Sequence, residues 1–252
     1  MPFAAGPACE VKELGKLSEL DRMVPLFRKG LGYDFTDKNN RCSRENGKTS
    51  SILDIGANIG YYSLFFASFG CNVRSYDPVE FNYNYHLASS RLNGFQKLLN
   101  INLKGLADKP GRLKMKSSKQ ESGESFIPTN TEHTLNPIIS DVHELEVDVE
   151  TLDTNTDPSS VISLLKMDVE GYEPYVLLGA SSLLKRRRIL SLVIEISGHS
   201  QSLDDLRIIR QVFDDSGYVP AMSTSGTFDW DAVISGWSKQ TRHEGVLFVP
   251  KN

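Results

Sequence analysis

From Ser51 to the end of the chain, short runs of apolar residues alternate with longer stretches of helical periodicity. Strands that alternate with helices in this way indicate an open, mostly parallel sheet with helices packed on it. The run at 161–167 is almost wholly apolar, which is typical of a central strand covered on both faces. We therefore predict an α/β fold. The strands are expected at 51–55, 72–76, 97–103, 161–167, 189–196, 218–222 and 244–249, and the helices at 61–69, from the second strand to residue 92, at 173–187 and at 203–215.

The length of 252 residues fits one large α/β domain. We predict an N-terminal helical extension over residues 1–50, in which segment 14–27 has apolar residues near helical spacing. The α/β domain is expected over 51–252, with a polar insertion near 117–136 that forms a loop on the substrate side. The extension is expected to pack over the sheet, and a lid over the site is the alternative.

The composition excludes several classes of protein. The formal net charge is −4 and the isoelectric point about 5.8, whereas nucleic-acid-binding domains are usually basic. No run of about 18 apolar residues is present to span a membrane, and no signal peptide is visible. The cysteines Cys9, Cys42 and Cys71 have no metal-ligand spacing, and Cys71 is expected to be a small core residue. We therefore expect a cytoplasmic protein in a reducing compartment, without a disulfide framework, that binds neither nucleic acid nor membrane.

The first predicted strand ends in a glycine-bearing turn that runs from Asp54 to Gly60. In an open parallel sheet, ligands bind at the carboxyl ends of the strands, so this turn is a candidate binding element. Gly56 permits a tight turn and close approach of a ligand to the backbone, and Gly60 permits close packing of the next helix. A dinucleotide fingerprint has a glycine where this chain has Asn58, which argues against NAD. A purely structural turn is the alternative.

The second predicted strand is followed by Asp77-Pro78. A carboxylate at this position accepts hydrogen bonds from both hydroxyls of a ribose, and its alternative role is to cap the following helix. Apolar Leu106 follows the third strand, where an adenine face fits.

Three acidic residues follow the fourth predicted strand. Asp168 and Glu170 are expected to point into the cleft, whereas Glu173 falls in a first helical turn and is interpreted as structural. Glu195 lies inside an apolar run, where an unpaired acid is costly to bury, which favours a role in the site. His199 is a candidate general base, with a plain surface position as the alternative.

These residues resemble the FkbM family of S-adenosylmethionine-dependent methyltransferases. The resemblance is carried by the segments Leu53–Ser63, Tyr76–Pro78 and Leu165–Glu173. It implies a Rossmann-like, doubly wound, seven-stranded sheet whose last strand is antiparallel, the fold of the class I methyltransferases. It also implies that residues 51–252 bind S-adenosylmethionine. The residues expected to bind it are Asp54, Gly56, Ala57, Asn58, Gly60, Asp77, Pro78, Leu106 and Asp168, with the glycine turn against the methionine part and Asp77 on the ribose.

The function favoured by this reasoning is methyl transfer to a hydroxyl of a sugar, a glycan or a secondary-metabolite-type acceptor. The base near that hydroxyl is expected to be Asp168, Glu170, Glu195 or His199. A divalent metal held by clustered acids is an alternative that is not favoured, because the ligand set is incomplete in the sequence. An NAD-linked oxidoreductase and a non-catalytic nucleoside-binding module remain as alternative functions.

Overall fold

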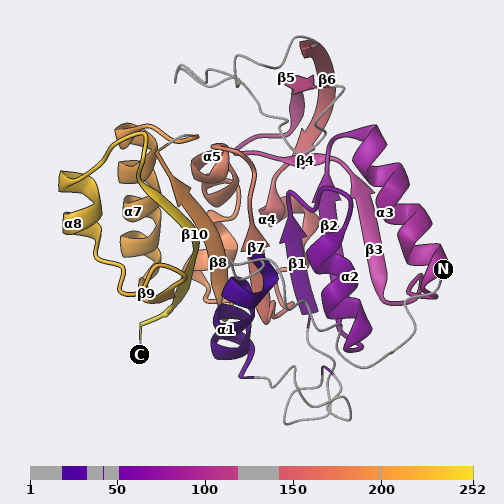
Figure 1. The fold of residues 1–252 in the computed structure, drawn as a ribbon, viewed down its shortest axis with the longest axis horizontal. Helices are drawn as coiled ribbons and strands as arrows, with labels where there is room; N and C mark the ends of the chain where they lie inside the picture. Colours follow the sequence, from indigo (N-terminus) through magenta and orange to yellow (C-terminus); the bar gives the residue numbers. More distant parts are fainter. Residues whose placement is uncertain (1–18, 33–41, 43–50, 119–141, 199, 252) are drawn as a thin grey trace, which may run out of the picture.

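The computed structural model describes residues 19–32, 42, 51–118, 142–198 and 200–251. Its centre is a seven-stranded sheet in the order β3-β2-β1-β7-β8-β10-β9 (Figure 1). β10 is antiparallel to both of its neighbours, and the pairs from β3 to β8 are parallel. The strands are β1 (Ser51–Ile55), β2 (Asn72–Asp77), β3 (Leu99–Leu103), β7 (Leu164–Met167), β8 (Leu192–Ser197), β9 (Tyr218–Ser223) and β10 (Arg242–Pro250).

Helices cover both faces of this sheet, and each face has its own apolar core. Neighbouring residues of one strand alternate between the two cores: Ile52 lies in the core under α1 and α2, and Leu53 lies in the core under α5 to α8. The predicted doubly wound fold with an antiparallel last strand is therefore confirmed. The helices are α1 (Glu19–Leu31), α2 (Tyr61–Ser68), α3 (Glu80–Leu92), α4 (Leu152–Asn155), α5 (Glu173–Leu178), α6 (Ser181–Lys185), α7 (Leu203–Ser216) and α8 (Trp230–Ser235).

The prediction of a single helix over 173–187 is wrong, because the structure has two short helices, α5 and α6, in this range. The carboxylate of Asp153 accepts hydrogen bonds from the backbone N–H groups of Ser182 and Leu183, at 2.9 and 3.0 Å, and so stabilises a new helix start. At Gly179, a Cβ atom would lie 2.0 Å from the carbonyl oxygen of Ala107, so the chain turns where no side chain fits. Helix α8 was missed in the sequence.

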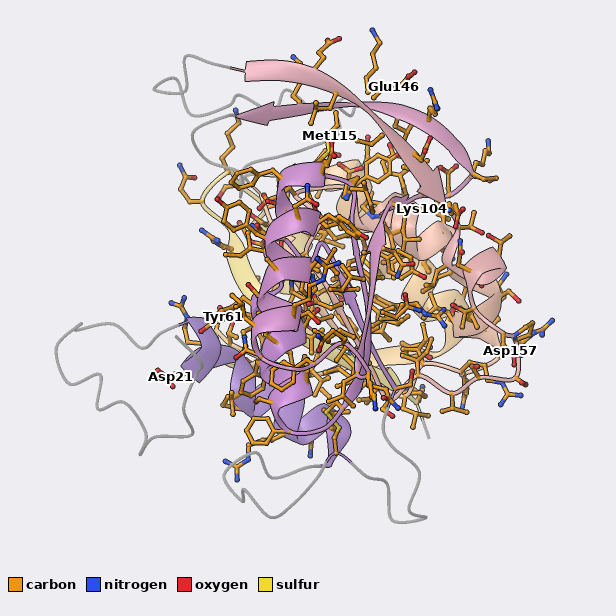
Figure 2. The ribbon with its side chains drawn as sticks, turned by 90° about the vertical axis from the view of Figure 1, so that its right-hand side faces the viewer. Asp21, Tyr61, Lys104, Met115, Glu146 and Asp157 are labelled. Carbon is orange, nitrogen blue, oxygen red and sulfur yellow. A yellow bond between two sulfur atoms is a disulfide. The ribbon has the colours of Figure 1, made fainter. Side chains whose placement is uncertain are left out.

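A second, three-stranded sheet projects beyond the carboxyl ends of the main strands. Its order is β4-β6-β5, and β5 and β6 form an antiparallel arm (Figure 1). Met115 faces the body of the molecule and is buried, whereas Glu146 lies on the outer side of the arm (Figure 2). The predicted polar insertion falls mostly on 119–141, outside the described residues. These strands are β4 (Gly105–Leu106), β5 (Gly111–Ser118) and β6 (Val142–Glu150).

Helix α1 belongs to the predicted N-terminal extension and packs on the main sheet. Its side chains Met23, Leu26 and Phe27 are buried in the core that α2 also covers. Residues 1–18, 33–41 and 43–50 lie outside the described part. Within the described part, no helix is both long and apolar enough to cross a bilayer.

The expectation of unpaired cysteines is wrong. Cys42 and Cys71 form a disulfide, and both are buried. The backbone N–H of Cys42 also donates to the carbonyl of Phe69 at 2.9 Å, so Cys42 itself is held against the turn between α2 and β2. Cys71 is a core residue, as predicted, but its sulfur is covalently bonded rather than free. The two cysteines lie 29 residues apart, and this spacing does not by itself indicate that they pair.

Candidate active site

A cavity of about 350 Å³ opens at the carboxyl ends of β1, β2 and β7. Met115 of the arm adds part of one wall, and Lys104, which lies between β3 and β4, also lines the cavity. Ligands of open α/β sheets bind at this edge, so the cavity is the candidate site. Of the residues singled out in the sequence, the cavity is lined by Gly56, Ala57, Asn58, Asp77, Pro78, Leu106, Asp168 and Glu170.

The glycine turn after β1 lies against the chain that follows β7. Gly56 has φ of 72°, and a Cβ atom at this position would lie 1.7 Å from the carbonyl oxygen of Asp168. No side chain therefore fits at residue 56, and the two strand ends are in direct backbone contact. Gly60 has φ of 92°, and a Cβ there would lie 2.2 Å from the ring of His86 on α3. The first glycine thus shapes the cavity, and the second lets α2 pack on α3.

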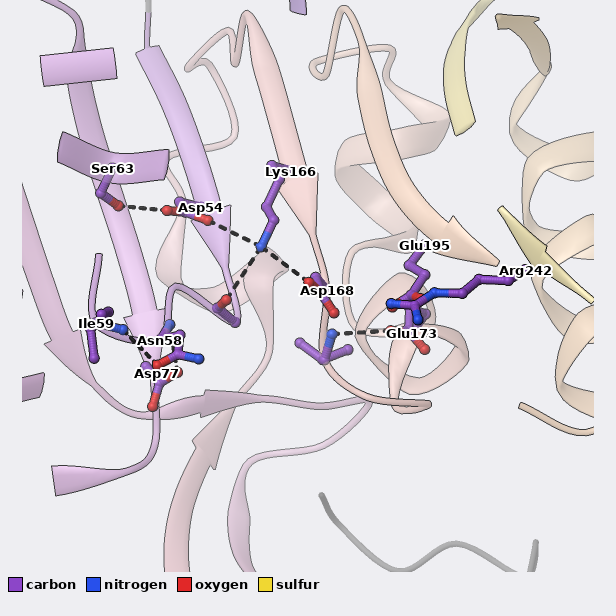
Figure 3. Close-up of polar contacts among 12 residues, drawn as sticks. Asp54, Asn58, Ile59, Ser63, Asp77, Lys166, Asp168, Glu173, Glu195 and Arg242 are labelled. Carbon is purple, nitrogen blue, oxygen red and sulfur yellow. Dashed lines mark hydrogen bonds and ion pairs between the residues drawn. The ribbon is translucent and has the colours of Figure 1, made fainter. Parts of the chain in front are cut away.

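Asp77, at the end of β2, ties the glycine turn to the start of α3. One carboxylate oxygen accepts from the backbone N–H of Asn58 at 2.9 Å (Figure 3). The other accepts from the backbone N–H of Val79 at 3.0 Å and from the side chain of Asn82 at 3.2 Å. Burial raises the pKa of this carboxyl above its ordinary value, although these three donors act in the opposite direction. Asp77 therefore stabilises the start of α3, as a capping residue would, and also faces the cavity, as a ribose-binding residue would.

The cluster of acids predicted after β7 and β8 is present, and its members differ in their surroundings. Glu173 is fully buried and accepts from the backbone N–H of Val169 at 3.0 Å and from the side chain of Gln201 at 2.8 Å. These bonds fix the loop that connects β7 to α5, which agrees with the structural role expected for Glu173. Asp168 and Glu170 face the cavity instead.

Glu195 lies beside this loop and is buried, with 8% of its surface exposed. Its carboxylate pairs with the guanidinium of Arg242 on β10 at 3.2 Å (Figure 3). Burial and the neighbouring charge of Asp168 raise the pKa of Glu195 to about 9 and that of Glu170 to about 8. Both groups therefore hold a proton more tightly than an ordinary glutamate, and Glu170 does so in the wall of the cavity.

Three of the predicted site residues that the structure describes do not line the cavity. Asp54 is fully buried behind the glycine turn, where it accepts from the Ser63 hydroxyl at 2.6 Å. Gly60 supports the helix packing described above, and Glu195 contacts Arg242. His199 lies outside the described residues.

Lys166 is a cavity residue that sequence reasoning missed. It lies on β7 directly beside Asp54 of β1, and its ammonium approaches the carboxylates of Asp54 and Asp168. A single lysine inside the apolar run 161–167 was the available indication, since a buried cation requires a partner. Met115 was missed because its place in the wall depends on how the arm folds back over the sheet, whereas Lys104 directly follows β3 and was not singled out.

A metal centre finds no support in the described ranges, where no group of three or more His, Cys, Asp or Glu side chains is arranged to hold an ion.

The sheet order, with an antiparallel strand inserted next to the edge, and a cavity at the tips of its central strands define a Rossmann-like methyltransferase fold. The sequence then identifies the family. The model of the FkbM methyltransferase domain matches residues 54–220, more than half of the chain, and the chain belongs to this family. Membership implies S-adenosylmethionine as the methyl donor. No curated protein matches the chain.

Solved structures that are similar to this chain include the following two. One is a methyltransferase FkbM from Methylobacillus flagellatus KT, with 15% identity and a TM-score of 0.48, over 91% of this chain and 59% of that one. The other is the N-terminal domain of human METTL16 in complex with SAH, with 12% identity and a TM-score of 0.48, over 92% of this chain and 70% of that one. The chain thus spans less than two thirds of the bacterial structure.

Proposed function

We propose that this protein transfers the methyl group of S-adenosylmethionine to a hydroxyl oxygen of a small acceptor, either a sugar or glycan or a secondary-metabolite-type molecule. The observation that carries the proposal is the convergence of the glycine turn, Asp77 and Asp168 on one cavity. Family membership supports methyl transfer over the NAD-linked alternative. The turn also lacks the middle glycine of a dinucleotide fingerprint, since Asn58 occupies that position.

The cavity fits the chemical groups of the methyl donor. Asp77 offers a carboxylate to the ribose hydroxyls, Leu106 offers an apolar surface to the adenine, and the turn at Gly56 leaves its backbone open to the methionine part. Among the described residues, Oδ1 of Asp168 is a buried acceptor without a hydrogen-bond partner, so it is available to a donor group of a ligand. The bound donor supplies an electrophilic methyl group, and the protein orients the acceptor towards it.

Glu170 is the best placed base for the acceptor hydroxyl. It lines the cavity, and its pKa of about 8 makes it a stronger proton acceptor than an ordinary carboxylate. Its side chain takes the hydroxyl proton as the oxygen attacks the methyl carbon. Asp168 lines the same cavity and is the second candidate. Glu195 lies outside the cavity lining, and the charges of Asp168 and Glu170 contribute to its raised pKa.

Binding of S-adenosylhomocysteine, measured by isothermal titration calorimetry, tests the donor site. Asp77→Ala removes the carboxylate that faces the ribose and is expected to weaken binding by about 100-fold, since hydrogen bonds to a charged group contribute roughly 1.5–3 kcal/mol each. Asp148→Ala is the control, because Asp148 is an exposed carboxylate on the arm that pairs with Arg112. Undiminished binding by a folded Asp77→Ala variant would remove the assignment, and tighter binding of NADH than of S-adenosylhomocysteine would restore the oxidoreductase.

Transfer of labelled methyl groups tests the acceptor class. Purified protein and labelled S-adenosylmethionine are incubated with separate fractions of small glycans and metabolites, of RNA and of protein. Label is expected in an alkali-stable ether of the glycan and metabolite fraction. Label in RNA or protein would contradict the proposed acceptor while leaving the donor assignment intact.

The predicted cytoplasmic location loses the support that it drew from unpaired cysteines. A disulfide between Cys42 and Cys71 is typical of an oxidising compartment, because cytosolic thiols are kept reduced. The cytoplasmic location therefore stays a prediction. Mass spectrometry of the non-reduced protein from its native source tests it: a Cys42–Cys71 disulfide would indicate an oxidising compartment, and free thiols a reducing one.

A further inference from the structure

Lys166 brings a buried positive charge to the wall of the cavity. It is 4% exposed, and its ammonium lies 3.8 Å from Oδ1 of Asp54 and 3.6 Å from Oδ2 of Asp168 (Figure 3). It also donates to the carbonyl oxygen of Gly56 at 3.4 Å and lies 4.9 Å from the centre of the Tyr62 ring. The same ammonium thus contacts the end of β1, the glycine turn and the end of β7.

Neutralisation of Asp54 explains only part of this arrangement. Asp54 is fully buried, so it needs a nearby cation. Asp168 differs, because about a third of its side chain is exposed and it faces the cavity. Lys166 reaches both carboxylates and itself lines the cavity, whereas Asp54 does not. Its charge is therefore felt by whatever occupies the cavity.

The three groups form a trio, Asp54, Lys166 and Asp168, with a formal net charge of −1 from two carboxylates and one ammonium. Without the lysine the same wall would carry −2. A sulfonium is a cation, and the thioether left after methyl transfer is neutral, so the charge of this wall acts on the donor and not on the sulfur of the product.

We propose that Lys166 is a positioning residue that sets how strongly the cavity prefers the charged methyl donor over its neutral product. The proposal rests on the proposed donor site. By partly cancelling the two carboxylates, the ammonium limits the stabilisation of the sulfonium and so favours the loss of its positive charge during methyl transfer. The same three contacts hold the glycine turn and the end of β7 at a fixed separation.

Calorimetric affinities for S-adenosylmethionine and S-adenosylhomocysteine test this inference without turnover. The quantity compared is the Kd for S-adenosylhomocysteine divided by the Kd for S-adenosylmethionine. Both are measured at one fixed pH near 7, because the pKa of Glu170 is about 8 and its charge changes with pH. Lys166→Met makes the trio −2 and is expected to raise the ratio about tenfold, the size expected for a unit charge about 10 Å away at an effective dielectric constant of about 20. Asp54→Asn makes the trio neutral and is expected to lower the ratio by a similar factor.

Two further variants separate charge from structure. Lys166→Arg keeps the charge, and the double variant Asp54→Asn with Lys166→Met restores a net charge of −1. Both are expected to stay within about threefold of the wild-type ratio. Circular dichroism checks that each variant is folded, and if Lys166→Met does not fold, Asp54→Asn and the double variant make the same comparison.

If Lys166 had only a structural role, we would expect a different pattern. Both ligands would then weaken together in Lys166→Met, and the ratio would stay at its wild-type value in every folded variant; that result overturns the inference and leaves the donor site intact. Wild-type protein that binds neither ligand would overturn the proposed function and the inference together.

Discussion

At the residue scale, the carboxylates of this site differ mainly in what surrounds them. Glu173 is fully buried but receives two hydrogen bonds from protein groups, so it serves the fold. Glu170 and Glu195 are largely buried beside further acids, and their pKa values are raised to about 8 and 9. Asp77 is stabilised by three donors and still faces the cavity. Chemistry is therefore expected from the groups that both face the cavity and retain proton affinity.

Removal of the proposed base tests this distinction. Glu170→Gln is expected to lower kcat by about 10²- to 10⁴-fold, the usual contribution of a general base, while the affinity for S-adenosylhomocysteine changes little. In the wild type, kcat/KM should rise with pH and level off above about 8, as the coupled pair of Glu170 and Glu195 loses a proton. The pH profile of methyl transfer measures both effects. Near-wild-type kcat in Glu170→Gln would exclude it as the base.

Glu195 is expected to make stability depend on pH. Its pKa in the folded protein is about 9, above the ordinary value of 4.5, so its contribution to stability is present below about pH 4.5 and is lost as the pH rises towards 9. Glu195 alone should therefore lower the free energy of unfolding of the wild type over this window, by at most roughly 1.4 kcal/mol per pH unit. Glu195→Gln should flatten the slope. Urea unfolding at several pH values measures it.

The control for this measurement is Glu144→Gln, which changes an exposed glutamate of the arm. It should keep the wild-type slope. Equal slopes in wild type and Glu195→Gln would mean that Glu195 is charged in the folded protein throughout this range.

The residues that could be predicted from the sequence are those that follow directly on a strand. Gly56, Asp77, Asp168 and Glu170 come just after apolar runs, and the carboxyl ends of neighbouring parallel strands meet at one edge. Lys166 could not be placed in this way, because its contacts depend on the register of β7 against β1. The Cys42–Cys71 disulfide likewise depends on where a distant segment of the chain packs.

At the element scale, the turn between β1 and α2 leaves no space for a side chain at residue 56. Gly56→Ala is expected to destabilise the protein by more than about 2 kcal/mol and to abolish donor binding, since the new Cβ would overlap the carbonyl oxygen of Asp168 in addition to the strain of a positive φ. Denaturant unfolding and calorimetry with S-adenosylhomocysteine measure the two effects.

Gly94 provides a matched control for this substitution. Its φ of 71° equals that of Gly56 within a degree, but a Cβ there would have no atom within 4 Å. Gly94→Ala is therefore expected to show the backbone strain alone, about 1–2 kcal/mol, with normal ligand binding. If the two variants lose equal stability, close packing at Gly56 has no energetic role.

The sequence predicts helices and strands correctly where their apolar periodicity is regular. It misses those whose bounds are set by a single side-chain contact. The strands from β1 to β3 and helix α7 follow their apolar patterns closely. The break between α5 and α6 depends on the side chain of Asp153, which is far away in the sequence and is joined to α6 only by the fold. Helix α8 is short and begins where the side chain of Asp229 accepts from the backbone N–H of Ala232. Periodicity is weak over so few residues.

At the scale of the whole molecule, one face of the sheet depends on a segment outside the α/β alternation. Helix α1 buries Leu26 and Phe27 in the core shared with α2, where the Phe27 ring packs edge-on against Phe66. The disulfide joins Cys42, which follows α1 in the chain, to Cys71, which directly precedes β2. The covalent bond therefore limits how far the extension separates from the sheet when the protein unfolds.

This bond is expected to contribute substantially to stability. It closes a loop with a sequence separation of 29 residues, for which the loss of chain entropy in the unfolded state corresponds to roughly 3–4 kcal/mol. The variant Cys42→Ala with Cys71→Ala should lower the free energy of unfolding by about this amount, as measured by guanidinium denaturation under non-reducing conditions. A reductant should destabilise the wild type and leave the double variant unchanged, which separates the bond from the two buried side chains. Equal stability of the oxidised wild type and the double variant would show that α1 is held to the sheet by its apolar contacts alone.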